Sequence, residues 1–193
     1  MRFELARQAV HLSGLLFVIV AQFVRKEIAV TYFLLIALFF FVYSWYVRTQ
    51  EKKIASLLGK LEARFRDFTL GFERKNANPF TGAMFFYLGC AIAFALFPLP
   101  FASAACAMLA IGDALSTVVG VNFGKHKICG KTLEGTIACF FGSLVGGIFF
   151  VNIYLAVTGA FFASLAELVP KIDDNLTIPV FSGLAMLLVS LAF

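Results

Sequence analysis

The sequence predicts an all-α protein, a polytopic membrane helical bundle. The first reason is composition, because 61% of the residues are hydrophobic, only 14% are charged and the mean hydropathy is +0.92. Soluble domains are far less apolar and more highly charged. The second reason is that the apolar residues fall in long runs, and about 20 of them in a row suffice to cross a bilayer. We therefore expect one membrane-embedded domain over residues 1–193.

Seven apolar runs, bounded by charged residues or by Pro and Gly, are candidate transmembrane helices. The first two are separated by Arg25 and Lys26, the third and fourth by the turn at Pro98-Leu99-Pro100, and the fifth and sixth by a turn around Asn152. Charged residues interrupt the last two, namely Glu167 and the stretch 171–174. The expected helices cover roughly 9–24, 28–47, 80–98, 101–121, 132–150, 152–170 and 177–193.

Residues 48–78 predict one further helix of a different kind. Apolar residues recur there at helical spacing and basic residues occupy the positions between them, a pattern typical of an amphipathic helix lying in the membrane interface. The apolar positions are Ile54, Leu57, Leu58, Leu61, Phe65 and Phe68, and the basic ones are Lys52, Lys53, Lys60, Arg64 and Arg66. We interpret this segment as a cytoplasmic linker that contacts anionic headgroups.

The distribution of Lys and Arg predicts the orientation. With seven spans, fourteen basic residues lie on the side of the N-terminus and only Arg25 and Lys26 lie on the other. Cytoplasmic loops carry the excess of Lys and Arg, so we expect a cytoplasmic N-terminus. Topology and lipid headgroups then account for the net charge of +5, and no nucleic-acid partner is expected.

The fourth expected span contains a carboxylate, Asp113, seven residues before Gly120. At about 1.5 Å per residue, Asp113 lies roughly 10 Å inside the helix, where a charge is costly unless it has a partner or a function. Small residues recur every four positions in the fourth and fifth spans and favour close packing. They are Gly112, Ser116 and Gly120, then Ala138, Gly142 and Gly146. In the simplest alternative, the glycines serve packing alone and Asp113 pairs with a lysine.

The loop between these two spans is suited to binding an anion. Lys125, Lys127 and Lys131 bring positive charge, and Gly124 and Gly130 let backbone amides approach a ligand closely. Lys131-Thr132 is expected to open a helix, whose N-terminal amides favour phosphate. The spacing excludes a Walker A motif, because Gly124 is one residue too far from Gly130 and an apolar helix precedes the loop in place of a strand. Glu134 fits a metal ligand and a helix-start acid equally well.

Two further polar clusters are predicted on the same side of the membrane. Arg7 and His11 share one helix face because they are four residues apart. Glu167 precedes Asp173-Asp174-Asn175, whose oxygens suit Mg²⁺ but are also typical of a helix cap.

The three clusters together resemble the signature of the CTP-dependent lipid-alcohol kinases, the family of dolichol or polyprenol kinase, phytol kinase and a CTP-dependent diacylglycerol kinase. The resemblance covers essentially the whole chain, with the clusters in the family's order. It rests on Gly112-Asp113 through Gly120 and Gly124 followed by Lys131-Thr132-Leu133-Glu134-Gly135-Thr136, on Arg7-Gln8-Ala9-Val10-His11-Leu12-Ser13-Gly14, and on Glu167 with Asp173-Asp174-Asn175-Leu176-Thr177-Ile178-Pro179.

The resemblance implies transfer of the γ-phosphoryl group of CTP, entering from the cytosol, to the hydroxyl of a membrane lipid alcohol, with dolichol or polyprenol favoured. Mg²⁺ would be the cofactor, consistent with phosphoryl transfer depending on positioned cations. The implied catalytic residues are Asp113, Lys131 and Glu134, and the implied metal ligands are Asp113, Glu134 and Asp174. The implied nucleotide-binding residues are Gly112, Gly120, Gly124, Lys125, Lys127, Gly130, Thr132, Gly135 and Thr136, and further candidates are Arg7, His11, Glu167, Asp174 and Asn175.

Two other functions compete with this one. A phosphatidate-type cytidylyltransferase would also use CTP, but the chain lacks the paired Lys-Asp and the Gly-His-Gly-Gly run that such enzymes carry near the C-terminus. A transporter would need polar groups through the whole membrane, whereas the outer halves of these spans are almost wholly apolar. The sequence leaves the oligomeric state open.

Overall fold

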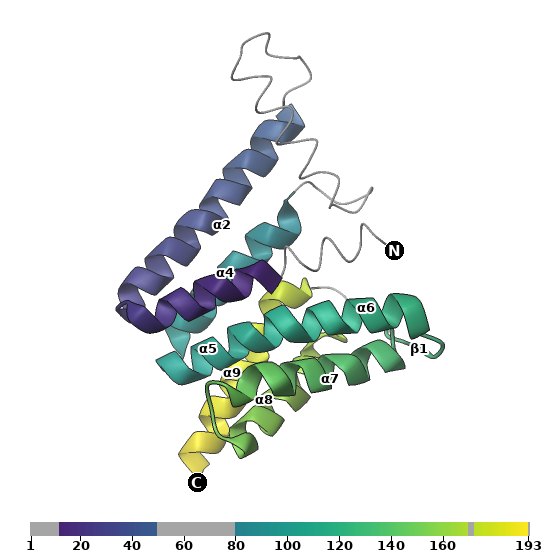
Figure 1. Cartoon of the computed structure of the whole chain (residues 1–193). Coiled ribbons are helices and arrows are strands. Elements are labelled where there is room, and N and C mark those ends of the chain that lie inside the picture. Colours follow the sequence, from purple (N-terminus) through teal and green to yellow (C-terminus); the bar gives the residue numbers. More distant parts are fainter. Residues whose placement is uncertain (1–11, 50–79, 170–171, 193) are drawn as a thin grey trace.

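The structure, a computed structural model, describes residues 12–49, 80–169 and 172–192 and is mostly helical (Figure 1). The all-α prediction is confirmed, and each of the seven predicted apolar runs contains a helix. The helices are Leu12–Phe23, which ends in the 3₁₀ turn η1 (Ala21–Phe23), α2 (Lys26–Thr49), α4 (Thr81–Leu96), α5 (Leu99–Met108), α6 (Ala114–Phe123), α7 (Leu133–Ile148), α8 (Ile153–Ala166) and α9 (Asp174–Ala192). A π-helical turn, η2 (Leu109–Asp113), joins α5 to α6 in one continuous helix.

Three of these helical segments are long and apolar enough to cross a membrane: Lys26–Val47, Leu99–Phe123 and Asp174–Ala192. The other four are apolar but have only 10–17 residues. A helix of 16 residues is about 24 Å long, which is less than the hydrocarbon thickness of about 30 Å. The helices are therefore compatible with a membrane protein, while the number of spans stays a prediction.

The two turns predicted at Pro98-Leu99-Pro100 and around Asn152 lie at helix boundaries. Pro98 precedes α5, and Pro100 is at the second helical position, where a missing N–H costs nothing. Asn152 caps α8, accepting a hydrogen bond from the Leu155 backbone N–H at 3.0 Å. In α9, by contrast, Pro179 lies inside the helix, and α9 begins earlier than the predicted start at residue 177. The amphipathic segment predicted over 48–78 falls almost wholly outside the described residues.

Small side chains form the packed interior where the helices meet. Residues 102–108 of α5 are all buried, and six of these seven are Ala, Ser or Cys, the exception being Met108. Figure 1 shows α6 and α7 side by side, with α8 and α9 completing that part of the bundle and α2 standing against α4. Small residues allow this close approach of backbones.

The glycines between η2–α6 and α7 are required by the distance between the two helices. A Cβ added at Gly112 would lie 2.2 Å from Ser143 Oγ, one at Gly142 2.9 Å from the Ile111 backbone oxygen, and one at Gly146 2.8 Å from the Ala107 oxygen. Real Cβ contacts are essentially never shorter than 3.0 Å. The small-residue faces predicted from the sequence therefore do pack against each other.

The connection between α6 and α7 is a short antiparallel hairpin, which the sequence reasoning missed. Strand β1 (Lys127–Ile128) pairs with β2 (Lys131–Thr132), with Lys127 opposite Thr132. Cys129 and Gly130 form the two-residue turn with φ of 47° and 82°, as type I′ hairpin turns require. The loop was expected to be a glycine-rich anion cradle ending at a helix that starts with Lys131-Thr132. Instead, Thr132 is the N-cap and α7 begins at Leu133.

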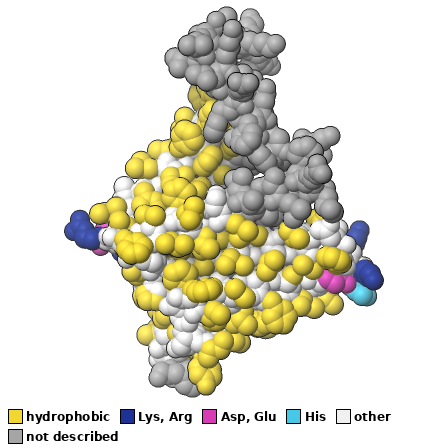
Figure 2. Space-filling model, in the orientation of Figure 1, with side chains coloured by type: hydrophobic (Ala, Val, Ile, Leu, Met, Phe, Trp, Pro, Cys, Tyr) yellow, Lys and Arg dark blue, Asp and Glu magenta, His cyan; other side chains and the backbone are white. Residues whose placement is uncertain are grey.

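The surface separates apolar from charged residues. Figure 2 shows Lys and Arg side chains at two opposite edges of this face, with hydrophobic side chains over most of the surface between them. In the sequence, Arg25 directly precedes α2 and Lys26 is its first residue, whereas Lys125, His126 and Lys127 are exposed in the connection after α6. This arrangement is compatible with a membrane protein whose polar groups lie at the ends of the bundle.

Candidate functional site

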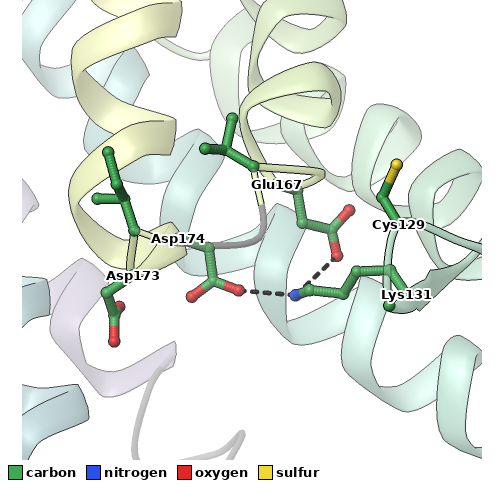
Figure 3. Close-up of a pocket in the computed structure, with 8 residues that line it drawn as sticks. Cys129, Lys131, Glu167, Asp173 and Asp174 are labelled. Atoms are coloured by element: carbon green, nitrogen blue, oxygen red, sulfur yellow. Dashed lines mark hydrogen bonds and ion pairs between the residues drawn. The ribbon is translucent and has the colours of Figure 1, made fainter.

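The hairpin, the end of α8 and the start of α9 enclose a pocket of about 270 Å³ at one end of the bundle (Figure 3). Three carboxylates and one lysine supply its charge, so the described lining is negative overall. The lining residues are Cys129, Gly130, Lys131, Glu167, Val169, Ile172, Asp173 and Asp174. The pocket thus joins two of the three polar clusters that the sequence singled out.

Lys131 reaches from β2 to the two carboxylates that come from α8 and α9. Its Nζ lies 2.7 Å from Asp174 Oδ2 and 3.3 Å from Glu167 Oε1 (Figure 3). Burial by itself lowers the pKa of Lys131, but the charges of Asp174 and Glu167 outweigh it and raise that pKa above its ordinary value. Lys131 is therefore a permanent cation at physiological pH.

Glu167 is the most deeply placed carboxylate of the pocket. Its side chain is 0% exposed, and its Oε1 accepts a hydrogen bond from Ser116 Oγ on α6 as well as from Lys131. Its second oxygen, Oε2, is buried and has no hydrogen-bond partner among the described residues. A buried carboxylate oxygen without a partner is costly, so it suggests a group that binds there.

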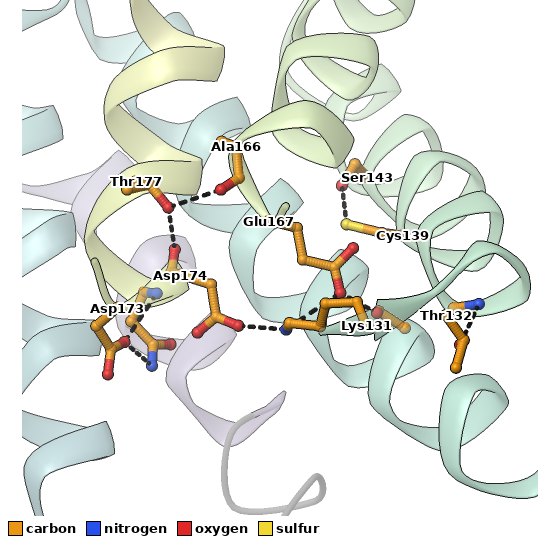
Figure 4. A network of polar contacts seen from close by, with 12 residues as sticks. Lys131, Thr132, Cys139, Ser143, Ala166, Glu167, Asp173, Asp174 and Thr177 are labelled. Carbon is orange, nitrogen blue, oxygen red and sulfur yellow. Dashed lines mark hydrogen bonds and ion pairs between the residues drawn. The ribbon is translucent and has the colours of Figure 1, made fainter. Parts of the chain in front are cut away.

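The two aspartates at the start of α9 have different roles. Asp173 is the N-cap, because its Oδ1 accepts from the Asn175 backbone N–H at 3.0 Å and from Asn175 Nδ2 at 2.8 Å. Burial raises the pKa of Asp173 above its usual range. Asp174 instead points to Lys131 (Figure 4), and Thr177 Oγ1 ties the start of α9 to the Ala166 oxygen at 3.2 Å. The cap interpretation of this segment therefore applies to Asp173, while a metal-ligand role of Asp174 stays a prediction.

Asp113 closes the π-helical turn η2 and is 9% exposed. Its charge adds to those that raise the pKa of Lys131, which places it within electrostatic reach of the pocket. Single π-helical turns inside α-helices occur frequently at functional sites. Ser116, three residues further on and so on the same helix face, is the residue that sequence reasoning assigned only to packing.

Glu134 does not belong to the pocket lining. Its carboxylate faces the connection that follows α6, accepting from the Lys125 and His126 backbone N–H groups at 3.1 and 3.3 Å. Its Oε1 also lies 2.7 Å from His126 Nδ1. Among the described residues, no three His, Cys, Asp or Glu side chains are grouped so that they could hold a metal ion alone. Asp113, Glu134 and Asp174 are thus not brought together as one ligand set.

Most of the remaining candidates are not part of the described pocket lining. Gly120, Gly124 and Gly135 surround Thr132, since a Cβ added at each would come within 3.0 Å of Thr132 Oγ1. Thr132 Oγ1 accepts from the Gly135 N–H at 3.2 Å, and Thr136 Oγ1 is buried without a partner among the described residues. Close packing accounts for these glycines, whereas Gly130 lines the pocket.

Lys125 and Lys127 are exposed. Arg7 and His11 lie outside the described residues.

Comparisons with known proteins add one relative. The chain is 27% identical to an uncharacterized protein of Rickettsia prowazekii (strain Madrid E) over 188 residues, covering 92% of this chain and 90% of that protein. No protein-family model matches the chain. No solved structure matches it either.

Proposed function

We propose that the chain is a CTP-dependent kinase that transfers a γ-phosphoryl group to the hydroxyl of a membrane lipid alcohol of the polyprenol or dolichol type. One observation carries the proposal: Lys131 lies between the carboxylates of Glu167 and Asp174 at the end of an apolar bundle. These residues come from separate parts of the sequence and coincide with segments that resemble the lipid-alcohol kinases.

The pocket chemistry suits phosphoryl transfer assisted by Mg²⁺. Mg²⁺ is usually held by one or two carboxylates together with substrate phosphates, so a complete protein cage is not needed. Glu167 and Asp174 would hold the ion, since Glu167 Oε2 is buried and has no partner among the residues that the structure describes. The ion would neutralise charge on the phosphates. Lys131 would stabilise the charge that spreads over the transferred group, and Ser116 would orient Glu167.

The surroundings of the pocket suit a lipid acceptor. Val169 and Ile172 give the pocket an apolar wall beside its carboxylates, and Ile172 is 54% exposed. A lipid alcohol has a polar hydroxyl at the end of an apolar chain, so it can present the hydroxyl to the polar side while its chain remains in lipid. The volume of about 270 Å³ leaves the chain outside the pocket.

The proposal requires the pocket to face the cytoplasm, where CTP is available. Cys129 lies in the hairpin turn, is exposed and lines the pocket, while the other three cysteines are buried. A thiol reagent that cannot cross membranes should therefore label Cys129 in inverted vesicles and leave it unlabelled in intact cells. Labelling in intact cells would place the pocket on the outer side and contradict the proposal.

The direct test uses purified protein with Mg²⁺, a panel of lipid alcohols, phosphatidate in a separate reaction, and CTP labelled at either the α- or the γ-phosphorus. A kinase transfers only the γ label to lipid. Incorporation of the α label into phosphatidate would instead identify a cytidylyltransferase. If neither product forms with any of the lipids, in protein that remains folded, both enzymatic assignments are overturned.

A further inference from the structure

The first turn of α7 holds the open end of the hairpin by several hydrogen bonds. The Leu133 backbone N–H donates to the His126 oxygen at 2.8 Å, one residue pair beyond the β1–β2 ladder. Glu134, the next residue, accepts from the backbone N–H groups of Lys125 and His126 and contacts the His126 ring. The connection after α6 is therefore attached to the same helical turn that follows β2.

The hairpin needs such an attachment. Each strand has only two residues, and an isolated two-stranded hairpin is marginally stable at best in water. The strand residues Lys127 and Ile128 are exposed, so apolar burial contributes little to their position. Hydrogen bonds from backbone N–H groups to a carboxylate are among the stronger ones in proteins, and here three donors converge on one side chain.

We propose that Glu134 is a positioning residue that orders the hairpin so that Lys131 reaches Glu167 and Asp174. Lys131 lies in β2, within three residues of Glu134 along the chain, and its long side chain places the cation correctly only if β2 is fixed. The consequence for turnover rests on the proposed function, whereas the ordering of the hairpin does not.

This role differs from direct metal or substrate binding. Both carboxylate oxygens of Glu134 already have hydrogen-bond partners in the hairpin connection, and Glu134 is absent from the described lining of the pocket. Asp174 and Glu167, by contrast, point into the pocket. Glu134 therefore orders the backbone of the hairpin that carries Lys131, whereas Glu167 and Asp174 contact the ammonium group of Lys131.

The test places a nitroxide spin label on Cys129 in the full chain and compares three variants. Glu134→Gln removes the charge while keeping the shape, so the backbone N–H groups of Lys125 and His126 lose a charged acceptor and their hydrogen bonds weaken. His126→Ala removes only the ring contact and leaves both backbone hydrogen bonds. Asn122→Ala is the matched control, because Asn122 is exposed nearby on α6 and, within the described part of the chain, its side chain donates only to the Val118 oxygen of its own helix.

We expect the label to become mobile in Glu134→Gln, to become partly mobile in His126→Ala and to keep the wild-type spectrum in Asn122→Ala. In unlabelled protein, Glu134→Gln should lower kcat by roughly 10- to 100-fold with a smaller change in KM, since misplacing a catalytic group by about 1 Å can cost that much. The thermal unfolding temperature should change little.

An unchanged label spectrum in Glu134→Gln would overturn the inference whatever the activity. A mobile label in Glu134→Gln would support the positioning role even if the wild type transferred no phosphate from CTP. That second result would reject the proposed function alone. A large loss of kcat without any change in label mobility would assign Glu134 a direct catalytic role and would also overturn the inference.

Discussion

The interface between η2–α6 and α7 and the pocket at the end of the bundle both draw on one stretch of sequence, residues 112–146, in different ways. At the interface backbones touch, and a Cβ added at Gly112 or Gly142 would collide with the facing helix. At the pocket charged side chains meet, and Lys131 bridges carboxylates from two other helices. The glycines at the helix interface therefore serve the fold, whereas Lys131 of the same stretch carries its charge into the pocket.

The comparison predicts separable effects of mutation. Changes at the interface should reduce stability and leave the turnover of each folded molecule nearly unchanged. Changes at the pocket that leave no buried charge without a partner should reduce turnover and leave stability nearly unchanged, because a buried ion pair contributes little net stability.

The largest effect is expected for Asp113→Asn, which keeps the shape of the side chain and removes its charge. Transfer from CTP should fall by at least about 1,000-fold, the upper end of the loss for one group that stabilises a transition state. Stability should be the same or higher, because a costly buried charge is removed. Near-normal turnover per folded molecule in an unstable variant would show that Asp113 is structural. Turnover and thermal unfolding measured on one sample distinguish the two.

Lys131→Ala should have the next largest effect. Loss of one charge-stabilising donor costs about 2–4 kcal/mol of transition-state stabilisation, roughly 30- to 900-fold in kcat/KM. The control is Lys26→Ala at the other end of the bundle, where no effect on transfer is expected. Equal losses in both variants would indicate that basic charge acts through attachment to lipid and would remove the distinction between pocket and surface.

A smaller effect, on stability alone, is expected for Gly142→Ala. The added Cβ would lie 2.9 Å from both the Ile111 oxygen and Leu115 Cδ1, and such overpacking costs about 1–3 kcal/mol. In a chain of this size each kcal/mol lowers the unfolding temperature by about 2–4 °C. Gly82→Ala is the matched control, since nothing lies within 4 Å of its added Cβ. Equal unfolding temperatures of the two variants would show that the interface glycines are not needed for close packing.

Patterns that act locally were predictable from the sequence. The seven apolar runs predicted the apolar helices that the structure describes, Pro98 and Asn152 predicted turns, and the small residues of α6 and α7 predicted a packed interface. The contact of Lys131 with Asp174 and Glu167 was predictable less directly, because the sequence only assigned the three charged clusters to one side of the membrane. Orientation, the span count and any role of Arg7 and His11 stay predictions.

Features that depend on tertiary context were not predictable. The hairpin turn puts Cys129 at φ 47°, although a residue with a side chain there is uncommon and gave no signal. The π-helical turn before Asp113 has no sequence signature. The hydrogen bonds of Glu134 to the hairpin connection were not predictable either, because its partners, the backbone N–H groups of Lys125 and His126, approach it only once the hairpin has formed.

The central claim, that the pocket charges serve phosphoryl transfer and not stability, is tested most directly by Glu167→Gln. The variant keeps an oxygen to accept from Ser116, and Lys131 keeps its 2.7 Å pair with Asp174, so no buried cation is stranded. Transfer of the γ-phosphoryl group of CTP and thermal unfolding should be measured on the same preparation. We predict a loss of transfer of about 100-fold or more, the usual scale for removing one group that stabilises transition-state charge, with an unfolding temperature equal to or above that of the wild type. Retained transfer in a protein that unfolds several degrees lower would contradict the account.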